Sequence, residues 1–171
     1  MGWKDFEMPK QLVCDEDTYT NTYGKFVAEP FERGYGTTIG NSLRRVLISS
    51  IEGTAVTSIK IDGVMHEFSN LPGVLEDVTE IILNIKKLIL RSHSKTPKPI
   101  YLKAEKKGEV TAKDIKTDET VEILNPDLHI ATLTKNTKLN IEMEVARGRG
   151  YVPAERNKKE DQPIGMIAVD S

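Results

Sequence analysis

Cysteine is almost absent from this sequence, with Cys14 as its one representative among 171 residues. A single cysteine excludes an internal disulfide framework and a zinc cluster built from several cysteines of one chain. There is no run of about 18 apolar residues, and the mixed, charged first residues lack the pattern of a secretory signal. We therefore expect a protein of the reducing cytoplasm that makes no use of a membrane.

An excess of charge of one sign is lacking as well. The 24 basic and 26 acidic side chains leave a formal net charge of -2. A chain so close to neutrality is not drawn as a whole to nucleic acid or to anionic lipid, so polyanion binding would need a local patch. Its length allows one large or two small domains.

Three glycines, Gly34, Gly36 and Gly40, stand where an apolar helix pattern begins. A glycine-rich turn before a helix is typical of nucleotide loops, because backbone N–H groups and the helix dipole attract phosphate. The spacing is one residue longer than the dinucleotide fingerprint, and the Gly-Lys-Ser/Thr of a P-loop is missing. A tight strand-to-helix turn is the favoured interpretation, with a nucleotide-binding enzyme as the alternative.

The helix that follows is expected over residues 37–50, capped by Thr37 or Thr38 and stopped by Gly53. Apolar residues recur on one face of it at helical spacing. These are Ile39, Leu43, Val46 and Leu47.

Arg44, Arg45 and Ile48 lie beside this apolar face. Two arginines next to an aliphatic contact are typical of residues that anchor protein interfaces. From periodicity alone, a surface helix with solvated arginines is the more ordinary interpretation. Both interpretations stay open at this point.

The rest of the chain alternates between strand and helix patterns. A strand is expected over residues 23–32, and a second one from Thr54 with Ala55, Thr57, Ile59 and Ile61 on one side. Asp62 and Gly63 indicate a hairpin turn. A second helix carries an apolar stripe, with acids in its first turns and lysines in its last, as the helix dipole favours. That stripe is Val74, Val78, Ile81, Ile82 and Ile85.

Beyond Leu88 the period is again two. Strands are expected at residues 99–106 and 138–145, with short ones near Val110, at 121–124 and at 129–133. The whole is an α+β protein with a seam near Gly53.

No set of side chains indicates a catalytic or metal centre. A catalytic histidine needs a positioned partner and a zinc ion needs three or four ligands, whereas His66, His93 and His129 have no companion set in the sequence. Glu76, Asp77 and Glu80 are placed at the start of a helix, where the dipole favours acids. We expect no cofactor, no metal and no catalytic residue.

A basic block, residues 147–159, contains Arg147, Arg149, Arg156, Lys158 and Lys159 around Tyr151. It could follow a phosphate backbone. Because the aromatics expected of single-strand binding are lacking, a solvated or protein-docking surface is favoured over a nucleic-acid-binding module.

Residues 29–88, from EPFERGYGTTIGNSLRRVLISS to EIILNIKKL, closely resemble the N-terminal domain of bacterial RNA polymerase alpha subunits. VARGRGYVPAERNKKEDQPIGMIAVDS resembles a second block of the same domain. The resemblance runs from about Met8 to the last residue. It implies a non-catalytic scaffold that dimerises and docks the beta and beta-prime subunits for DNA-templated transcription, with DNA reached only through the complex.

The resemblance also implies roles for particular residues. Arg45 and Ile48 on the first helix match positions that dock the beta subunit, as does Glu80 on the second helix. Lys86 is similar to a position associated with beta-prime contact. The apolar face of the first helix would belong to the dimer core.

The family architecture implies that residues 1–53 form part of a dimerisation subdomain and residues 54–171 an inserted β-rich subdomain. We expect the dimerisation subdomain to be incomplete, because the family's remaining strands, second dimerisation helix, linker and C-terminal DNA-binding domain find no match here. An apolar helix face without its cover needs another chain to stabilise it. The homodimer of the family is therefore doubtful for this chain.

Overall fold

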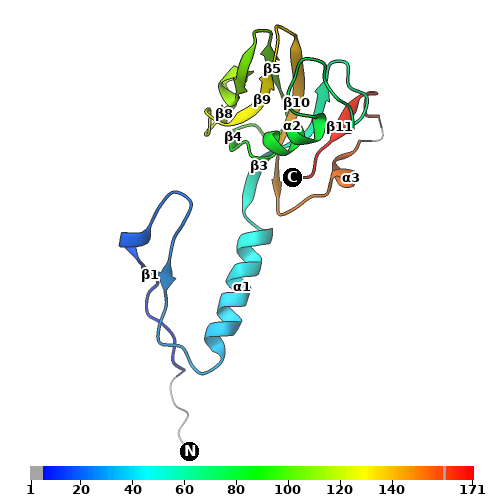
Figure 1. Ribbon diagram of the computed structural model, residues 1–171. Helices are drawn as coiled ribbons and strands as arrows, with labels where there is room; N and C mark the ends of the chain where they lie inside the picture. The colour runs from blue at the N-terminus through cyan, green and yellow to red at the C-terminus, as the bar shows by residue number, and fades with distance from the viewer. Residues whose placement is uncertain (1–5, 160) are drawn as a thin grey trace, which may run out of the picture. The chain divides into compact units, whose positions relative to one another are not determined.

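The computed structural model describes residues 6–159 and 161–171 (Figure 1). The chain divides into two compact units, the first ending at Ser50 and the second running from Ile51 to Ser171. Both helices and antiparallel strands are present, and the fold is α+β.

The first unit has little regular structure before its helix. Strands β1 (Val13–Cys14) and β2 (Phe26–Val27) pair antiparallel, and the 3-10 turn η1 (Glu16–Thr18) lies in the connection between them. The strand expected over residues 23–32 is therefore much shorter than its pattern suggested. Among the residues that the structure describes, it pairs with the two-residue β1 alone, and an unpaired segment cannot continue as a strand.

Helix α1 (Tyr35–Ser49) begins directly after Gly34, whose φ of 89° is in the left-handed region that favours glycine. The expected cap at Thr37 or Thr38 is wrong, because Thr38 already donates its backbone N–H to the Gly34 carbonyl at 3.4 Å. Gly53 does not stop the helix either. The helix ends at Ser49, and Gly53 lies within the next strand.

No residue of the described part of the first unit, residues 6–50, is buried. Phe6 and Tyr35 stack edge to face with ring centroids 4.4 Å apart, yet both rings remain largely exposed. A 15-residue helix is marginal in water without packing. The described part of the first unit thus buries no side chain that could hold α1 in place.

The second unit is organised around an antiparallel five-stranded sheet. The longest strand, β10, lies at its centre and pairs with β3 on one side and β5 on the other. In spatial order the strands are β11 (Met166–Ala168), β3 (Glu52–Ile61), β10 (Leu139–Arg149), β5 (Lys98–Ala104) and β7 (Ile115–Lys116).

Two shorter antiparallel pairs complete the β structure. They are β4 (Leu90–Ser92) with β8 (Val121–Ile123), and β6 (Gly108–Thr111) with β9 (His129–Leu133). Helix α2 (Val78–Ile85) contacts β9. The 3-10 turn η2 (Ala112–Asp114) follows β6, and the short helix α3 (Ala154–Asn157) precedes β11.

The core lies between these elements and is aliphatic. The expected alternation along β10 is confirmed, with Leu139, Ile141, Met143 and Val145 at most 1% exposed. Fully buried residues of β3, β5, β9 and α2 complete the interior. They are Ile59, Ile61, Ile100, Leu102, Ile130, Leu133, Val78, Ile81 and Ile85.

A β-bulge breaks the alternation expected along β3. Glu144 pairs with Ser58 while Val145 pairs with Val56, so Thr57 is an extra residue without a partner in the ladder. One extra residue moves the side chains before it to the other face of the sheet. The prediction that Ala55 and Thr57 share a side with Ile59 is therefore wrong, and Val56 is buried instead.

Two further expectations are corrected around α2. Asp62 and Gly63 do form a turn, but the segment after them is not a strand, so there is no hairpin. Helix α2 begins at Val78, and Val74 forms an isolated bridge with Leu133 instead of a helical turn. The apolar pattern continues from the extended segment at Val74 into helix α2, because both segments contribute side chains to the same core.

The burial difference within α2 gives a direct test of this core. Ile81→Ala should lower the free energy of unfolding by about 2–5 kcal/mol, because Ile81 is fully buried. Leu83→Ala on the same helix is the control, since Leu83 is 51% exposed and should change stability by about 0.5 kcal/mol or less. Urea unfolding measures both; equal losses would contradict the burial pattern.

Candidate protein-docking surfaces

Helix α1 is an uncovered amphipathic helix in the described part of its unit. Leu43, Val46, Leu47 and Ile48 are each between 53% and 60% exposed, and Ile39 is half-buried. Residues three and four apart lie on one side of a helix, so Ile39, Leu43, Val46 and Leu47 form a continuous apolar stripe. An exposed stripe of this kind marks a surface that another polypeptide can cover.

The arginines of α1 are available for a partner. Arg45 lies three residues before Ile48, so these two side chains share one side of the helix next to the stripe. Within residues 6–159 and 161–171, no ion pair joins Arg44 or Arg45 to a carboxylate. A guanidinium without an internal partner can still donate its hydrogen bonds outward.

The glycines of this region do not form a loop. Gly34 makes the turn, but Gly36 and Gly40 lie inside α1, so the expected tight turn of three glycines is wrong for two of them. They can be helical because the left-handed Gly34 alone reverses the chain into the helix. A nucleotide-binding site of this kind requires a glycine-rich loop, and the structure has a helix in its place.

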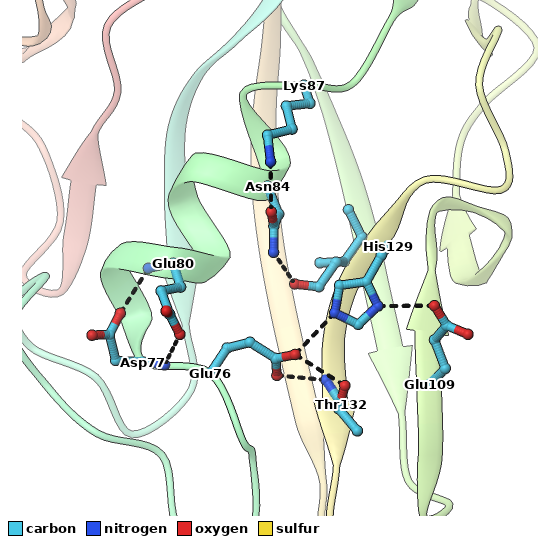
Figure 2. Close-up of polar contacts among 9 residues, drawn as sticks. Glu76, Asp77, Glu80, Asn84, Lys87, Glu109, His129 and Thr132 are labelled. Carbon is cyan, nitrogen blue, oxygen red and sulfur yellow. Dashed lines mark hydrogen bonds and ion pairs between the residues drawn. The ribbon is translucent and has the colours of Figure 1, made fainter.

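Helix α2 begins with a capping box, drawn in Figure 2. The Asp77 carboxylate accepts the Glu80 backbone N–H at 2.7 Å, and the Glu80 carboxylate accepts the Asp77 backbone N–H at 3.3 Å. These bonds satisfy two donors that a helix leaves unpaired at its start. Glu80, one of the candidate docking residues, thus already has an internal role.

Lys86, the other candidate on α2, is also paired within the chain. Its ammonium donates to both oxygens of Asp170, at 2.8 and 2.7 Å, and thereby ties the end of α2 to the segment after β11. The hydrogen bond from Lys86 is the largest cause that holds the pKa of Asp170 below its ordinary value. Both side chains are about one-third exposed, so the pair can be reached from solvent.

His129 has two carboxylate partners, contrary to the expectation that it stands alone. Figure 2 shows its ring between Glu76, just before α2, and Glu109 on β6. Nε2 lies 2.9 Å from Oε1 of Glu76, and Nδ1 lies 3.0 Å from Oε1 of Glu109. The partners are 53 and 20 residues away in sequence, and no local pattern could have brought them together.

Glu76 is the most enclosed member of this cluster, with a side chain only 13% exposed. Its carboxylate also accepts the backbone N–H and the hydroxyl of Thr132, at 2.6 and 2.9 Å. Glu76 was expected to be a first-turn helix acid. It precedes the helix instead, because Asp77 takes the capping position.

The charges of this cluster support one another. The hydrogen bond with Glu76 raises the pKa of His129 above its ordinary value, against the effect of burial, and Glu109 adds to the rise. Burial opposes ionisation of Glu76, but the bonds from Thr132 and His129 outweigh it and hold the pKa of Glu76 below its ordinary value. Both shifts favour the charged forms, the imidazolium of His129 and the carboxylate of Glu76. The cluster is therefore a salt bridge.

The basic block of residues 147–159 is partly neutralised inside the unit. Arg147 and Arg149 both pair with Glu52, at 2.6 and 2.7 Å, and Lys159 pairs with Glu144. The hydrogen bond from Arg149 is the largest cause that lowers the pKa of Glu52. A phosphate backbone would have to compete with these carboxylates, which disfavours a nucleic-acid interface here.

The described residues offer no metal site. Within residues 6–159 and 161–171, no three or more His, Cys, Asp or Glu side chains gather so that they could hold an ion. Among the helices in that part of the chain, none has the length and apolarity needed to cross a membrane.

Comparison with known proteins identifies the second unit. The chain belongs to a family of RNA polymerase domains, since a family model matches residues 59–171, more than half of its length. That family is described as the RNA polymerase Rpb3/RpoA insert domain.

Curated relatives extend the similarity over nearly the whole chain. The DNA-directed RNA polymerase subunit alpha of Symbiobacterium thermophilum is 65% identical over 167 residues, which cover 96% of this chain and 52% of the relative. The subunit of the same name from Geobacter metallireducens is 54% identical over 170 residues, which cover 99% of this chain and 50% of the relative. The chain spans about half the length of the curated relatives it matches.

The capping box predicts a specific loss of stability. Asp77→Ala should destabilise the second unit by about 1 kcal/mol, because the Glu80 backbone N–H loses its acceptor. Asp77→Asn keeps an acceptor oxygen at the same place and should cost only a fraction of that. Thermal unfolding followed by circular dichroism compares the two, and indistinguishable melting temperatures would show that the cap contributes nothing.

Proposed function

We propose that this chain is a non-catalytic assembly scaffold of a DNA-directed RNA polymerase in the bacterial cytoplasm. It docks the beta and beta-prime subunits, which carry out the chemistry, and reaches DNA only through the complex. The relatives named as alpha subunits support this assignment, as does the membership of residues 59–171 in the insert-domain family. The chain itself is assigned no catalytic centre, metal or cofactor.

The exposed stripe of α1 is the observation that carries the proposal. Three side chains of the stripe, Leu43, Val46 and Leu47, remain more than half exposed, as does Ile48 beside it, on a helix that is marginal by itself. Covering them with another polypeptide contributes on the order of 1 kcal/mol each, which favours association over solvation. A nucleotide-binding enzyme would need the glycine loop that α1 replaces.

We assign the beta-docking role to Arg45 and Ile48, with Glu80 as a further contact on α2. Arg45 offers a planar fork of donors beside an aliphatic side chain, a combination suited to a carboxylate or carbonyl group at the edge of an apolar interface. Glu80 can accept an additional hydrogen bond, since only one of its oxygens is engaged in the capping box.

Lys86 is assigned to contact with the beta-prime subunit. An ammonium group has three donors, and Asp170 accepts from two directions, so one donor remains for a partner. The beta-prime subunit would then contact Lys86 while Lys86 stays paired with Asp170. The residues Ile39, Leu43, Val46 and Leu47 are assigned to the interface with a second alpha subunit.

The assignment of Arg45 can be tested by co-purification with a beta subunit. Arg45→Ala should weaken the complex by about 2 kcal/mol or more, roughly thirtyfold in dissociation constant, because a partner group is left unpaired. Arg44→Ala is the matched control, since it removes the same side chain from the neighbouring position on the helix. Far-ultraviolet circular dichroism checks that both variants keep the wild-type fold.

Equal retention of the two variants on the beta subunit would remove Arg45 from the interface. Loss of both complexes to the same extent would indicate a general charge effect instead of the proposed contact.

The second test concerns the cover of α1. In the isolated chain, backbone amides of α1 should exchange with solvent nearly as fast as in an unfolded peptide, and the beta subunit or a second alpha chain should slow them. Hydrogen exchange with mass spectrometry measures this, alongside analytical ultracentrifugation to define the oligomeric state. A monomer whose α1 amides are already protected would contradict the need for a partner surface.

A further inference from the structure

The His129 cluster joins three separate parts of the second unit. The imidazole lies at the start of β9, Glu109 is on β6, and Glu76 is on the segment that leads into α2 (Figure 2). Both ring nitrogens are within 3.0 Å of a carboxylate oxygen. The imidazole is thus the bridge between two acids that do not bond each other.

The chemistry of the three groups requires a particular protonation state. An ionised carboxylate only accepts hydrogen bonds, and a neutral imidazole has a single N–H to donate. Neutral His129 could therefore serve only one of the two acids, and its other nitrogen would direct a lone pair at the second. The imidazolium form donates to both.

We propose that His129 is a pH-sensitive latch, whose imidazolium form fastens the segment before α2 to the β6–β9 pair through Glu76 and Glu109. Deprotonation leaves one carboxylate facing a ring nitrogen that no longer donates. The latch lies one residue from the Asp77 cap, so its release weakens the anchoring of the start of α2. This device is additional to the proposed docking function and does not depend on it.

Other charged groups of the neighbouring elements are engaged with partners of their own. Asp77 and Glu80 bond each other's backbone at the start of α2, and Asp114 in η2 accepts the Thr111 backbone N–H at 2.9 Å. Lys113 in η2 pairs with Asp127, which precedes β9. His129 is the sole titratable residue in β9 itself, His129–Leu133.

The directions of the pKa shifts define when the latch is closed. Because the pKa of His129 is raised in the fold, its stabilisation is complete below about 6.5 and is lost as pH rises through the raised value. Because the pKa of Glu76 is lowered, its stabilisation is present above about 4.5 and is lost as pH falls through the lowered value. The latch is strongest between these two titrations.

The experiment is an NMR titration of the histidine ring protons in the whole chain. His129 should titrate above 6.5, with His66 and His93 measured in the same sample for comparison. Glu76→Gln should lower the pKa of His129, because the largest favourable partner loses its charge. Glu105→Gln, a charge removal on the turn after β5, should leave it unchanged.

A stability measurement gives the functional consequence of the titration. The melting temperature of the wild type should exceed that of His129→Gln at about pH 6 and lose roughly 2–4 °C of that advantage by about pH 9. The protection factors of the Leu75 and Thr132 amides, which correct for the intrinsic rise of exchange with pH, should fall over the same range, since Leu75 donates to the Thr132 carbonyl and Thr132 to Glu76.

Parallel melting curves of the two proteins across pH, or a His129 pKa at or below 6.5, would overturn the latch. Should His129→Gln fail to fold, the titration of the wild type against Glu76→Gln decides alone: an unchanged His129 pKa refutes the proposal and a lowered one supports it.

Discussion

Strand β10 is the constraint on which the second unit depends. It pairs with β3 along one edge and with β5 along the other, and one face of it supplies four residues that are almost wholly buried. Three of these four residues, Ile141, Met143 and Val145, have ladder partners on both flanking strands, so the register of β10 fixes which face of the sheet is the core. The helix and the smaller strand pairs then cover that face.

The first unit contrasts with this arrangement. Its described residues bury no side chain, while its one long helix has an uncovered apolar stripe and two arginines without internal ion pairs. In the second unit the candidate docking residues Glu80 and Lys86 already stabilise the fold. The second unit thus contains its own core, whereas the described part of the first unit presents an uncovered helix that is marginal by itself.

The sequence predicted the elements whose pattern is set by a core. The alternation of β10, the extent of β9 and the apolar stripe of α2 all follow from contact with one interior. Two-residue strands such as β1 and the bulge at Thr57 were not predicted, because neither produces a recognisable change in the amino-acid pattern of its segment. The start of α1 was misplaced for a different reason. Gly34 alone makes the turn into the helix, whereas three glycines were expected to form it.

The site could be predicted only in part. Periodicity found the stripe of α1, but the proposed roles of Arg45, Ile48, Glu80 and Lys86 rest on family resemblance. Spacing alone cannot distinguish a docking arginine from a solvated one. The partners of His129 were missed because they approach from distant segments, and only the tertiary fold brings them within hydrogen-bonding distance.

The extra residue in β3 constrains how this gene can vary in length. Thr57 lets the buried Val56 and Ile59, an odd number of positions apart, point to the same interior. Loss of the Thr57 codon alone would remove the bulge and leave Val56 opposite Val145 and Glu52 opposite Arg149, with their side chains on the present faces. Loss of a paired residue such as Ala55 would instead shift the residues before it by one position and turn Glu52 away from Arg147 and Arg149. Length is consequently freer to change at Thr57 than at the paired positions of this strand.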